Sequence, residues 1–188
     1  MLVTNIWHVT STKTELTRAR LLATALELFA EQGYEQTTVA QIAARASVSE
    51  MTFFRYFPAK EDLLLDDPYD PLMVAAVAQQ PRDLPPLTRA VRGIRAAWHS
   101  LPVPDSADVR NRVRIIANTP SLRASMWRNA AETEQVIAQA LGDGLASRVA
   151  AAAAIAALNT ALLEWGLGSG DLGELIDEAL DVLEASDD

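Results

Sequence analysis

The sequence predicts an all-α fold in two parts, a small N-terminal bundle and a larger C-terminal helical domain. Apolar residues recur every three or four positions along most of the chain, and no stretch alternates as a β-strand would. The charge also changes near residue 60. Residues 1–60 hold six Lys/Arg and five Asp/Glu, a net of +1, whereas residues 61–188 hold ten and twenty, a net of −10. This asymmetry predicts a boundary there.

Composition limits the chemistry that the chain can support. Of the 188 residues 49% are hydrophobic, so a substantial core is expected. Cysteine is absent, and the two histidines, His8 and His99, lie far apart in the sequence. No nucleophile–base pair, glycine-rich phosphate loop or metal-ligand cluster is present. We therefore expect no enzyme activity, no cofactor and no metal site.

The location of the protein is predicted from two segments. Residues 1–12 lack the basic and small-residue pattern of a signal peptide, so we expect a flexible N-terminal arm. The longest apolar run, Val149 to Leu158, is too short to span a bilayer. The prediction is a cytoplasmic protein without a membrane partner.

Helix start and stop signals divide residues 13–60 into three helices. Capping boxes are predicted at Thr12 with Glu15 and at Thr38 with Gln41, because the residue types and the three-residue spacing fit. Gly33 supplies the stop between these two helices. After the connection Ala46-Ser47-Val48, Ser49 can cap a third helix that ends before Pro58, and Val48 can pack on Phe53 as a hydrophobic staple.

The third predicted helix has two different faces. Phe53 and Phe57 are four positions apart and share one face, which suits anchoring in a core. Met51 and Arg55 share the opposite face, with Thr52 beside them. A short helix that is packed behind and carries such side chains in front is typical of a recognition helix in the DNA major groove. A helical hairpin with a solvated face remains the alternative.

The segment from Thr17 to Leu64, which includes LLATALELFAEQGYEQTTVAQIAARASVSEMTFFRYFPAKEDLL, resembles the N-terminal domain of the TetR family of transcriptional regulators. The resemblance covers about a quarter of the chain without gaps. It implies a helix-turn-helix DNA-binding domain over residues 13–60 and a ligand-binding and dimerisation domain over residues 61–188. The implied DNA-binding residues are Thr38, Ser49, Met51, Thr52, Phe54, Arg55, Tyr56 and Lys60.

Within that set, the resemblance implies different roles. Met51, Thr52 and Arg55 match positions that face bases or the adjacent backbone, whereas Thr38, Tyr56 and Lys60 match phosphate-facing positions. Two departures from the family pattern stand out. Phe54 replaces a tyrosine, so one phosphate-bonding hydroxyl is missing, and Ser47 replaces a glycine in the turn, where a left-handed backbone favours glycine.

The second part is predicted to contain longer helices. Proline and glycine clusters break the helical pattern at 66–68, 81–86, 101–104, 119–120, 142–144 and 168–170. Helices are expected at roughly 61–66, 71–79, 86–99, 105–118, 121–141, 145–167 and 171–185. This region also resembles the C-terminal domain of an actinobacterial subgroup of the family, whose relatives are linked to acyl-CoA-like effectors.

The last two predicted helices carry apolar stripes, separated by a tight glycine turn. In a homodimer, two such helices from each chain would form a four-helix bundle. The alternative is that the stripes only close the core of one chain. The candidate interface residues are Ala154, Leu158, Leu162, Trp165, Leu175, Ile176 and Leu180.

The middle helices are expected to enclose an effector pocket. Trp98, Met126 and Trp127 could line it, although aromatic residues on helices are often simply core. Arg95 belongs to a stripe with Arg89 and Arg92 that could meet a phosphate-bearing ligand or be solvated beside acidic groups. A second set of arginines, Arg110, Arg112 and Arg114, offers the same two interpretations. His99 suits a helix C-terminal cation or a core histidine.

Together these features predict a ligand-responsive transcriptional regulator. It would act as a repressor that binds a palindromic double-stranded DNA operator as a homodimer and is released by a small-molecule effector, hydrophobic or acyl-CoA-like. The alternative is a helical protein–protein adaptor that does not read DNA.

Overall fold

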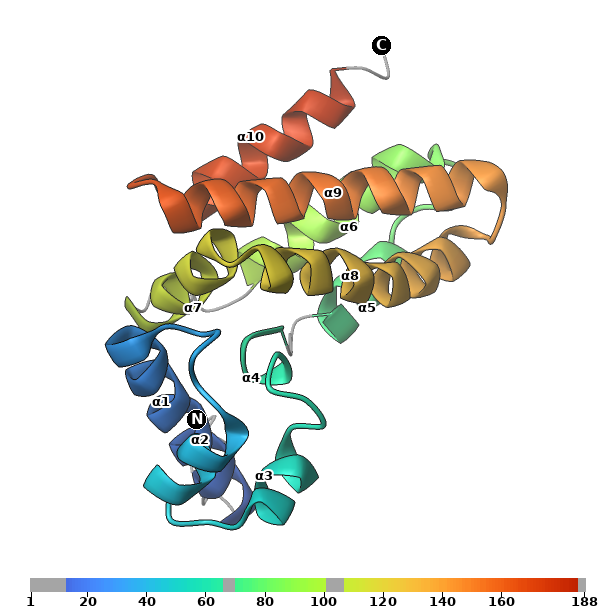
Figure 1. Ribbon diagram of the computed structural model, residues 1–188. Helices are drawn as coiled ribbons and strands as arrows, with labels where there is room; N and C mark the ends of the chain where they lie inside the picture. Colours follow the sequence, from blue (N-terminus) through green and yellow to red (C-terminus); the bar gives the residue numbers. More distant parts are fainter. Residues whose placement is uncertain (1–12, 66–69, 101–106, 186–188) are drawn as a thin grey trace, which may run out of the picture. The chain divides into compact units, whose positions relative to one another are not determined.

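A computed structural model describes residues 13–65, 70–100 and 107–185, and every regular element in these ranges is an α-helix (Figure 1). This confirms the predicted all-α class. The helices are α1 (Lys13–Gln32), α2 (Val39–Arg45), α3 (Glu50–Tyr56), α4 (Asp62–Leu65), α5 (Asp70–Ala78), α6 (Pro86–Ser100), α7 (Ala107–Asn118), α8 (Pro120–Leu141), α9 (Leu145–Leu167) and α10 (Leu172–Glu184).

The chain forms two compact units, which divide between Leu63 and Leu64, three residues after the boundary expected from charge. Four predictions lie outside the described residues: the N-terminal arm, the Thr12 cap and the breaks at 66–68 and 101–104.

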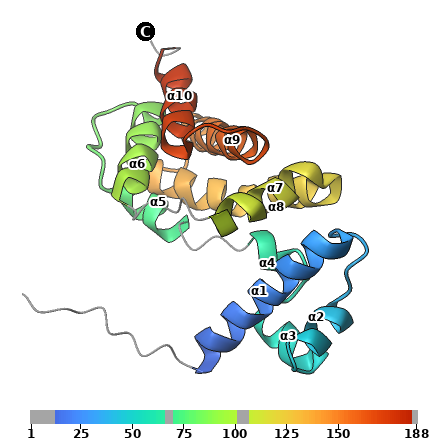
Figure 2. The same cartoon turned by 90° about the vertical axis from the view of Figure 1, so that its left-hand side faces the viewer.

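The first unit packs α1, α2 and α3 around one apolar core (Figure 2). Leu21, Leu28 and Phe29 of α1 are buried, as helical spacing predicts, and so are Ile42 of α2 and Phe53 of α3. Aromatic pairs extend this core, because the rings of Phe29 and Tyr34 lie 5.1 Å apart and those of Phe53 and Phe57 lie 5.8 Å apart.

The turn between α2 and α3 requires a left-handed residue. Ser47 has φ +55°, and the bonds Val48 N–H to Ala43 O (2.9 Å) and Ser47 N–H to Ala44 O (3.1 Å) close the end of α2. This is the glycine-favouring backbone that the sequence suggested at Ser47. Ser47 therefore holds the turn in a conformation that strains an L-residue.

The second unit is organised around α9, which packs against α6, α7, α8 and α10. Its alanines let neighbouring helices approach closely, and Ala150, Ala151 and Ala154 are buried. Glycine serves the same purpose at Gly166 of α9, where an added Cβ would lie 2.8 Å from the Val113 side chain of α7. By length and composition α9 could also cross a membrane, but its buried face packs as the core helix of this unit.

The predicted dimer residues need correction. Ala154, Leu158, Trp165, Ile176 and Leu180 are 8% exposed or less within the single chain. The remaining two, Leu162 and Leu175, pack partly buried against the same core. The stripes therefore close the core of the chain, and these five buried side chains are unavailable to a partner.

Candidate functional site

The helix-turn-helix formed by α2 and α3 begins each helix with a side-chain cap. The Oγ1 of Thr38 accepts from the N–H of Gln41 (3.2 Å), and the Gln41 side chain accepts from the N–H of Thr38 (2.8 Å), which completes the predicted capping box. The Oγ of Ser49 accepts from the N–H of Thr52 (3.1 Å) at the start of α3. These caps set where both helices begin.

The two faces of α3 are confirmed. Phe53 is fully buried and Phe57 is nearly so, while Met51 is 84% exposed and Phe54 is 47% exposed. Arg55 is exposed beside them and is the one cation in the α3 sequence. The exposed face therefore combines two large apolar side chains with one guanidinium, on a helix that the core holds from behind.

Tyr56 connects this face to α1. The guanidinium of Arg55 lies 5.3 Å from the centre of the Tyr56 ring. Burial acts to raise the pKa of the Tyr56 phenol, but hydrogen bonding to Arg55, Thr17 and Thr14 outweighs burial, so the pKa is lowered. The phenol is thus held by residues of two helices.

Lys60 is partly buried, and its ammonium is held by backbone groups of the first unit. Its Nζ donates to the carbonyl oxygens of Tyr34 and Thr37, both at 2.9 Å, and lies 3.9 Å from the centre of the Tyr34 ring. Burial lowers the pKa of the ammonium, partly opposed by Glu35 and Glu61. In this position Lys60 fixes the connection between α1 and α2.

Two other cations of the first unit also have intramolecular roles. Arg45 forms an ion pair with Glu31 at 2.7 Å, and the Arg18 guanidinium lies 4.5 Å from the centre of the Phe57 ring. The positive charge on the α3 face therefore comes from Arg55.

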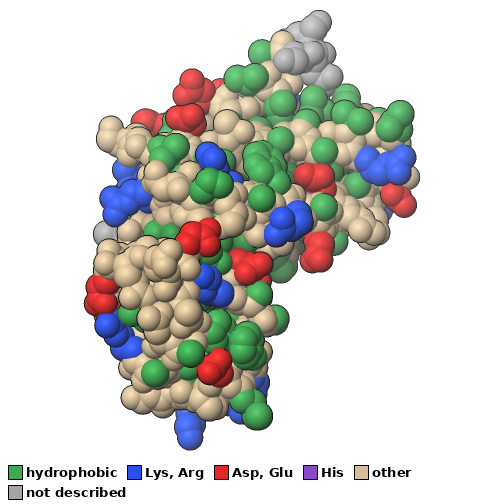
Figure 3. Space-filling view, in the orientation of Figure 1, with side chains coloured by type: hydrophobic (Ala, Val, Ile, Leu, Met, Phe, Trp, Pro, Cys, Tyr) green, Lys and Arg blue, Asp and Glu red, His purple; other side chains and the backbone are tan. Residues whose placement is uncertain are grey.

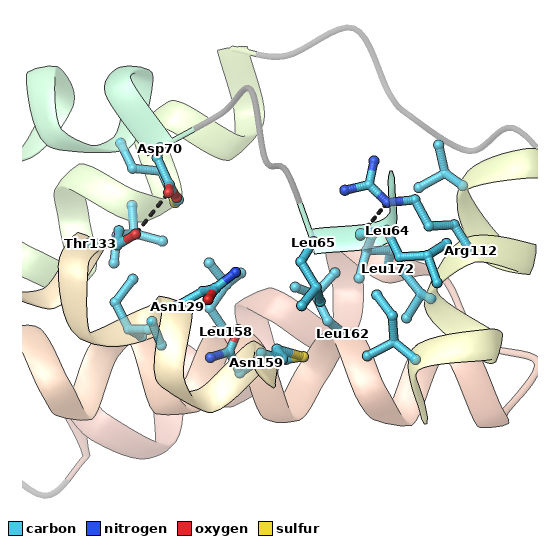
Figure 4. A pocket seen from close by; sticks show the side chains of 18 of the residues that line it. Leu64, Leu65, Asp70, Arg112, Asn129, Thr133, Leu158, Asn159, Leu162 and Leu172 are labelled. Atoms are coloured by element: carbon cyan, nitrogen blue, oxygen red, sulfur yellow. Dashed lines mark hydrogen bonds between the residues drawn. The ribbon is translucent and has the colours of Figure 1, made fainter. Parts of the chain in front are cut away.

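The second unit encloses a cavity of about 180 Å³ among α4 to α10 (Figure 4). Trp98 and Met126 line it, as expected. Trp127 and Arg95 do not, which corrects those two predictions. Trp127 is 45% exposed, and Arg95 instead forms ion pairs with Asp177, Asp181 and Glu184 of α10.

Five polar residues interrupt the described apolar lining, and three of them have clear partners. Asp70 accepts from the Thr133 hydroxyl at 2.7 Å, and Arg112 donates from Nε to the Leu64 carbonyl oxygen at 2.6 Å. Figure 4 shows these two pairs at opposite ends of the view, with the carboxamides of Asn129 and Asn159 between them. The cavity is thus apolar with polar groups at a few positions, as ligand sites are.

The remaining arginines mostly hold the fold together. Arg89 is 5% exposed and donates to the carbonyl oxygens of Leu141 (2.9 Å) and Ala140 (3.2 Å), so it caps the C-terminal end of α8. Arg110 donates to Gly170 O (2.7 Å), and its guanidinium lies 4.6 Å from the centre of the Trp165 ring. The buried Arg89 thus fits neither predicted alternative, whereas Arg95 is paired with acidic groups, as one of the two alternatives expected.

His99 lies at the end of α6, where its Nε2 is 3.2 Å from the Asp177 carboxylate. This is the helix C-terminal position that the sequence suggested as one of two options.

Sequence reasoning missed several cavity residues, above all Asn159. A signal was present, because Asn159 interrupts the apolar pattern of Ile155, Leu158 and Leu162 on α9. Asp70 and Thr133 carried no such signal, since they lie 63 positions apart and only the packing of α5 on α8 joins them.

Fold and site together define a class: an all-helical protein with a helix-turn-helix head and a second helical domain that encloses a cavity. The profile of the family described as bacterial regulatory proteins, tetR family, matches residues 21–66, and that of the MftR C-terminal domain matches residues 84–187. The chain therefore belongs to the tetR family of bacterial regulatory proteins.

Individual relatives agree with this assignment. The transcriptional regulator TcmR of Streptomyces glaucescens is 38% identical over 135 residues, which cover 68% of this chain and 59% of TcmR. MftR of Mycobacterium tuberculosis is 28% identical over 116 residues, or 61% of this chain and 59% of MftR. The matched segments thus span less than two thirds of these relatives.

Solved structures share the fold. SmeT, the repressor of the Stenotrophomonas maltophilia efflux pump SmeDEF, matches with a TM-score of 0.58 and 23% identity over 92% of this chain and 91% of SmeT. NalD of Pseudomonas aeruginosa matches with a TM-score of 0.58 and 23% identity over 92% of this chain and 96% of NalD.

Proposed function

We propose that the chain is an effector-controlled transcriptional repressor that binds a palindromic operator as a homodimer. The observation that carries the proposal is the α3 face, which is held rigidly by Phe53 and Phe57 and presents Met51, Phe54 and Arg55 outward. Together with the family, this arrangement supports α3 as the helix that enters the major groove.

Base reading by this face would combine apolar and charged contacts. Met51 and Phe54 suit the C5-methyl groups of thymine, and Arg55 suits a guanine edge or a phosphate. Thr52 is partly exposed beside them, and its hydroxyl lies 3.0 Å from the Ser49 Oγ. We infer that Thr38, Ser49 and Tyr56 set the position of the head on the backbone, while Lys60 acts indirectly by fixing the connection between α1 and α2.

The dimer surface is assigned to residues that the single chain leaves exposed. On α9, Leu145 is 72% exposed, Val149 is 60% exposed and Leu167 is 58% exposed, and partly buried alanines lie between them. Val182 of α10 is 64% exposed. Figure 3 shows hydrophobic side chains gathered over the second unit with charged groups around them. An isologous contact through α9 and α10 would cover this surface.

Release of DNA would begin in the cavity. Leu64 and Leu65 of α4 contribute to its lining, and α4 follows directly on the last segment of the head. A ligand that prefers one position of α4 would shift the balance between two arrangements of the heads. SmeT has been solved as a complex with triclosan, which supports a small apolar effector in this fold.

Selection from random duplex DNA tests the proposal. The purified chain should enrich a two-fold symmetric motif, since a symmetric dimer reads two half-sites. No enriched motif at low salt, in a chain shown to be folded and dimeric, would contradict it.

One observation favours the adaptor as a second candidate. The exposed α3 face carries two large apolar side chains and a single cation, which also suits a protein partner. In that case DNA affinity would be unchanged when Met51, Thr52 and Arg55 are replaced by alanine.

A further inference from the structure

We infer that the cavity takes a compact, uncharged, mostly apolar molecule whose hydrogen-bonding group is recognised by Asn159. This inference rests on the proposed function, since it names the chemical class of the effector. It gives a specific chemical form to the expected hydrophobic effector.

The first reason is size. The cavity has a volume of about 180 Å³. A cavity of roughly 150 Å³ lined by Leu, Ile and Phe holds one benzene molecule, whereas sites for drug-sized ligands enclose roughly 300–1,000 Å³. The space therefore suits one aromatic ring with a short alkyl chain.

The second reason is the chemistry of the lining. Fourteen of the nineteen lining residues are apolar. They include Met73, Ile94 and Ile116 beside the Trp98 and Met126 side chains, so most of a bound molecule would contact hydrocarbon or aromatic groups. Burying apolar ligand surface against such walls is favourable, and burying an unpaired charge there is costly.

The third reason is charge balance. Among the described residues that line the cavity, one is acidic and one is basic, Asp70 and Arg112, and they lie at opposite ends of the view in Figure 4. The Asp70 carboxylate would repel an anion, and the Arg112 guanidinium would repel a cation. The opposite charges of these two residues cancel within the described lining, so an uncharged ligand is repelled by neither of them.

The fourth reason is Asn159 itself. It is only 9% exposed, lines the cavity, and makes no hydrogen bond to another described residue. A carboxamide offers two N–H donors and one acceptor oxygen, and leaving such groups unpaired inside a protein is unfavourable. A ligand group that both donates and accepts, such as a phenol, an alcohol or an amide, satisfies it. Asn129, also in the lining, is exposed and less constrained.

Calorimetric titration of the full chain with three matched compounds tests this inference. Ethylbenzene is the apolar reference, 4-ethylphenol adds a neutral hydrogen-bonding group, and 4-ethylbenzoate adds a negative charge. The variant Asn159→Leu replaces the carboxamide by an apolar group of similar size. Asn118→Leu, at the exposed end of α7, is the control.

The expected result has two parts. In the wild type and in Asn118→Leu, 4-ethylphenol binds at least roughly tenfold more tightly than 4-ethylbenzoate. In Asn159→Leu, the ratio of the affinity for 4-ethylphenol to that for ethylbenzene falls roughly tenfold, while ethylbenzene still binds. The milder variant Asn159→Ala provides the same comparison if Asn159→Leu does not fold.

Three results would overturn the inference: no saturable binding of any compound to the wild type, tighter binding of 4-ethylbenzoate than of 4-ethylphenol, or an unchanged phenol-to-hydrocarbon ratio in both Asn159 variants. DNA is absent from this titration, and ligand is absent from the operator selection. Failure of the inference and failure of the proposed function therefore appear in separate measurements.

Discussion

Arg112 donates a hydrogen bond from its Nε to the carbonyl oxygen of Leu64, with a distance of 2.6 Å. The bond ties α7 to α4, and both residues line the cavity. A carbonyl near the end of a short helix lacks an intrahelical partner, so a guanidinium is an effective substitute. The position of α4 in the second unit thus depends on a side chain that a ligand would touch.

Replacing Arg112 by methionine should destabilise the protein. The change keeps the apolar stem but leaves the Leu64 carbonyl without its charged donor, so the free energy of unfolding should fall by about 1–3 kcal/mol. Urea denaturation followed by circular dichroism measures this. Arg114→Met is the control, since Arg114 is exposed and its side chain bonds locally to Asn111 among the described residues, and it should change stability by less than about 0.5 kcal/mol. Equal effects for both variants would contradict the assigned role of Arg112.

Ser47→Gly should stabilise the protein. Ser47 has φ +55°, where an L-residue is strained and glycine is not. Glycine has more conformational freedom in the unfolded chain, and this offsets part of the gain from the relieved strain. The net increase in the free energy of unfolding should be about 0.5–1 kcal/mol. In contrast, Ala44→Gly within α2 should lower stability by about 1 kcal/mol. A loss of stability in Ser47→Gly would show that the serine side chain makes a compensating contact.

Val149→Arg should disrupt the dimer without unfolding the chain. Val149 is 60% exposed in the single chain, so the charge remains solvated in a monomer but would be buried in an α9 interface. Sedimentation equilibrium should give a monomer for Val149→Arg and a dimer for the wild type. Leu16→Arg, at a 60% exposed position on α1, should remain dimeric. If the Val149→Arg variant is still dimeric, the dimer interface does not include the surface around Val149.

Leu63→Asp should uncouple the effector from DNA release. Leu63 is 2% exposed and belongs to α4, the helix that links the two units. The variant should bind operator DNA, and it should remain bound when a compound is added that releases the wild-type protein from the operator. Fluorescence anisotropy of a labelled operator measures both steps, and Leu63→Ala provides a milder change. Normal release from both variants would rule out α4 as the link.

Local rules predicted much of the fold. The capping box of Thr38 and Gln41, the turn at Ser47 and the two faces of α3 depend on residues a few positions apart, and helical periodicity places those residues reliably. Each of the predicted helices of the second part has a counterpart close to its expected bounds, because proline and glycine mark the ends.

Predictions from the sequence were incomplete where the contacts of a side chain depend on packing between segments that are distant in the chain. An apolar stripe on a helix looks the same whether it faces its own core or a partner, so Trp165 and Leu180 were placed in an interface although they are buried in the chain. The contacts of Lys60 could not be predicted for the same reason, because its ammonium meets carbonyls of Tyr34 and Thr37, more than twenty positions earlier. The cavity has the same origin, since its lining comes from seven helices.

The binding of operator by the α3 face is the central claim, and the affinity of one triple variant tests it most directly. Fluorescence anisotropy at fixed salt should compare the wild type with Met51→Ala/Thr52→Ala/Arg55→Ala on the selected operator. The control is Arg123→Ala, an exposed arginine on α8. We predict that the triple variant loses at least roughly a hundredfold in affinity and that Arg123→Ala binds as the wild type does. An unchanged affinity in a folded triple variant would contradict DNA reading by α3 and would favour the adaptor.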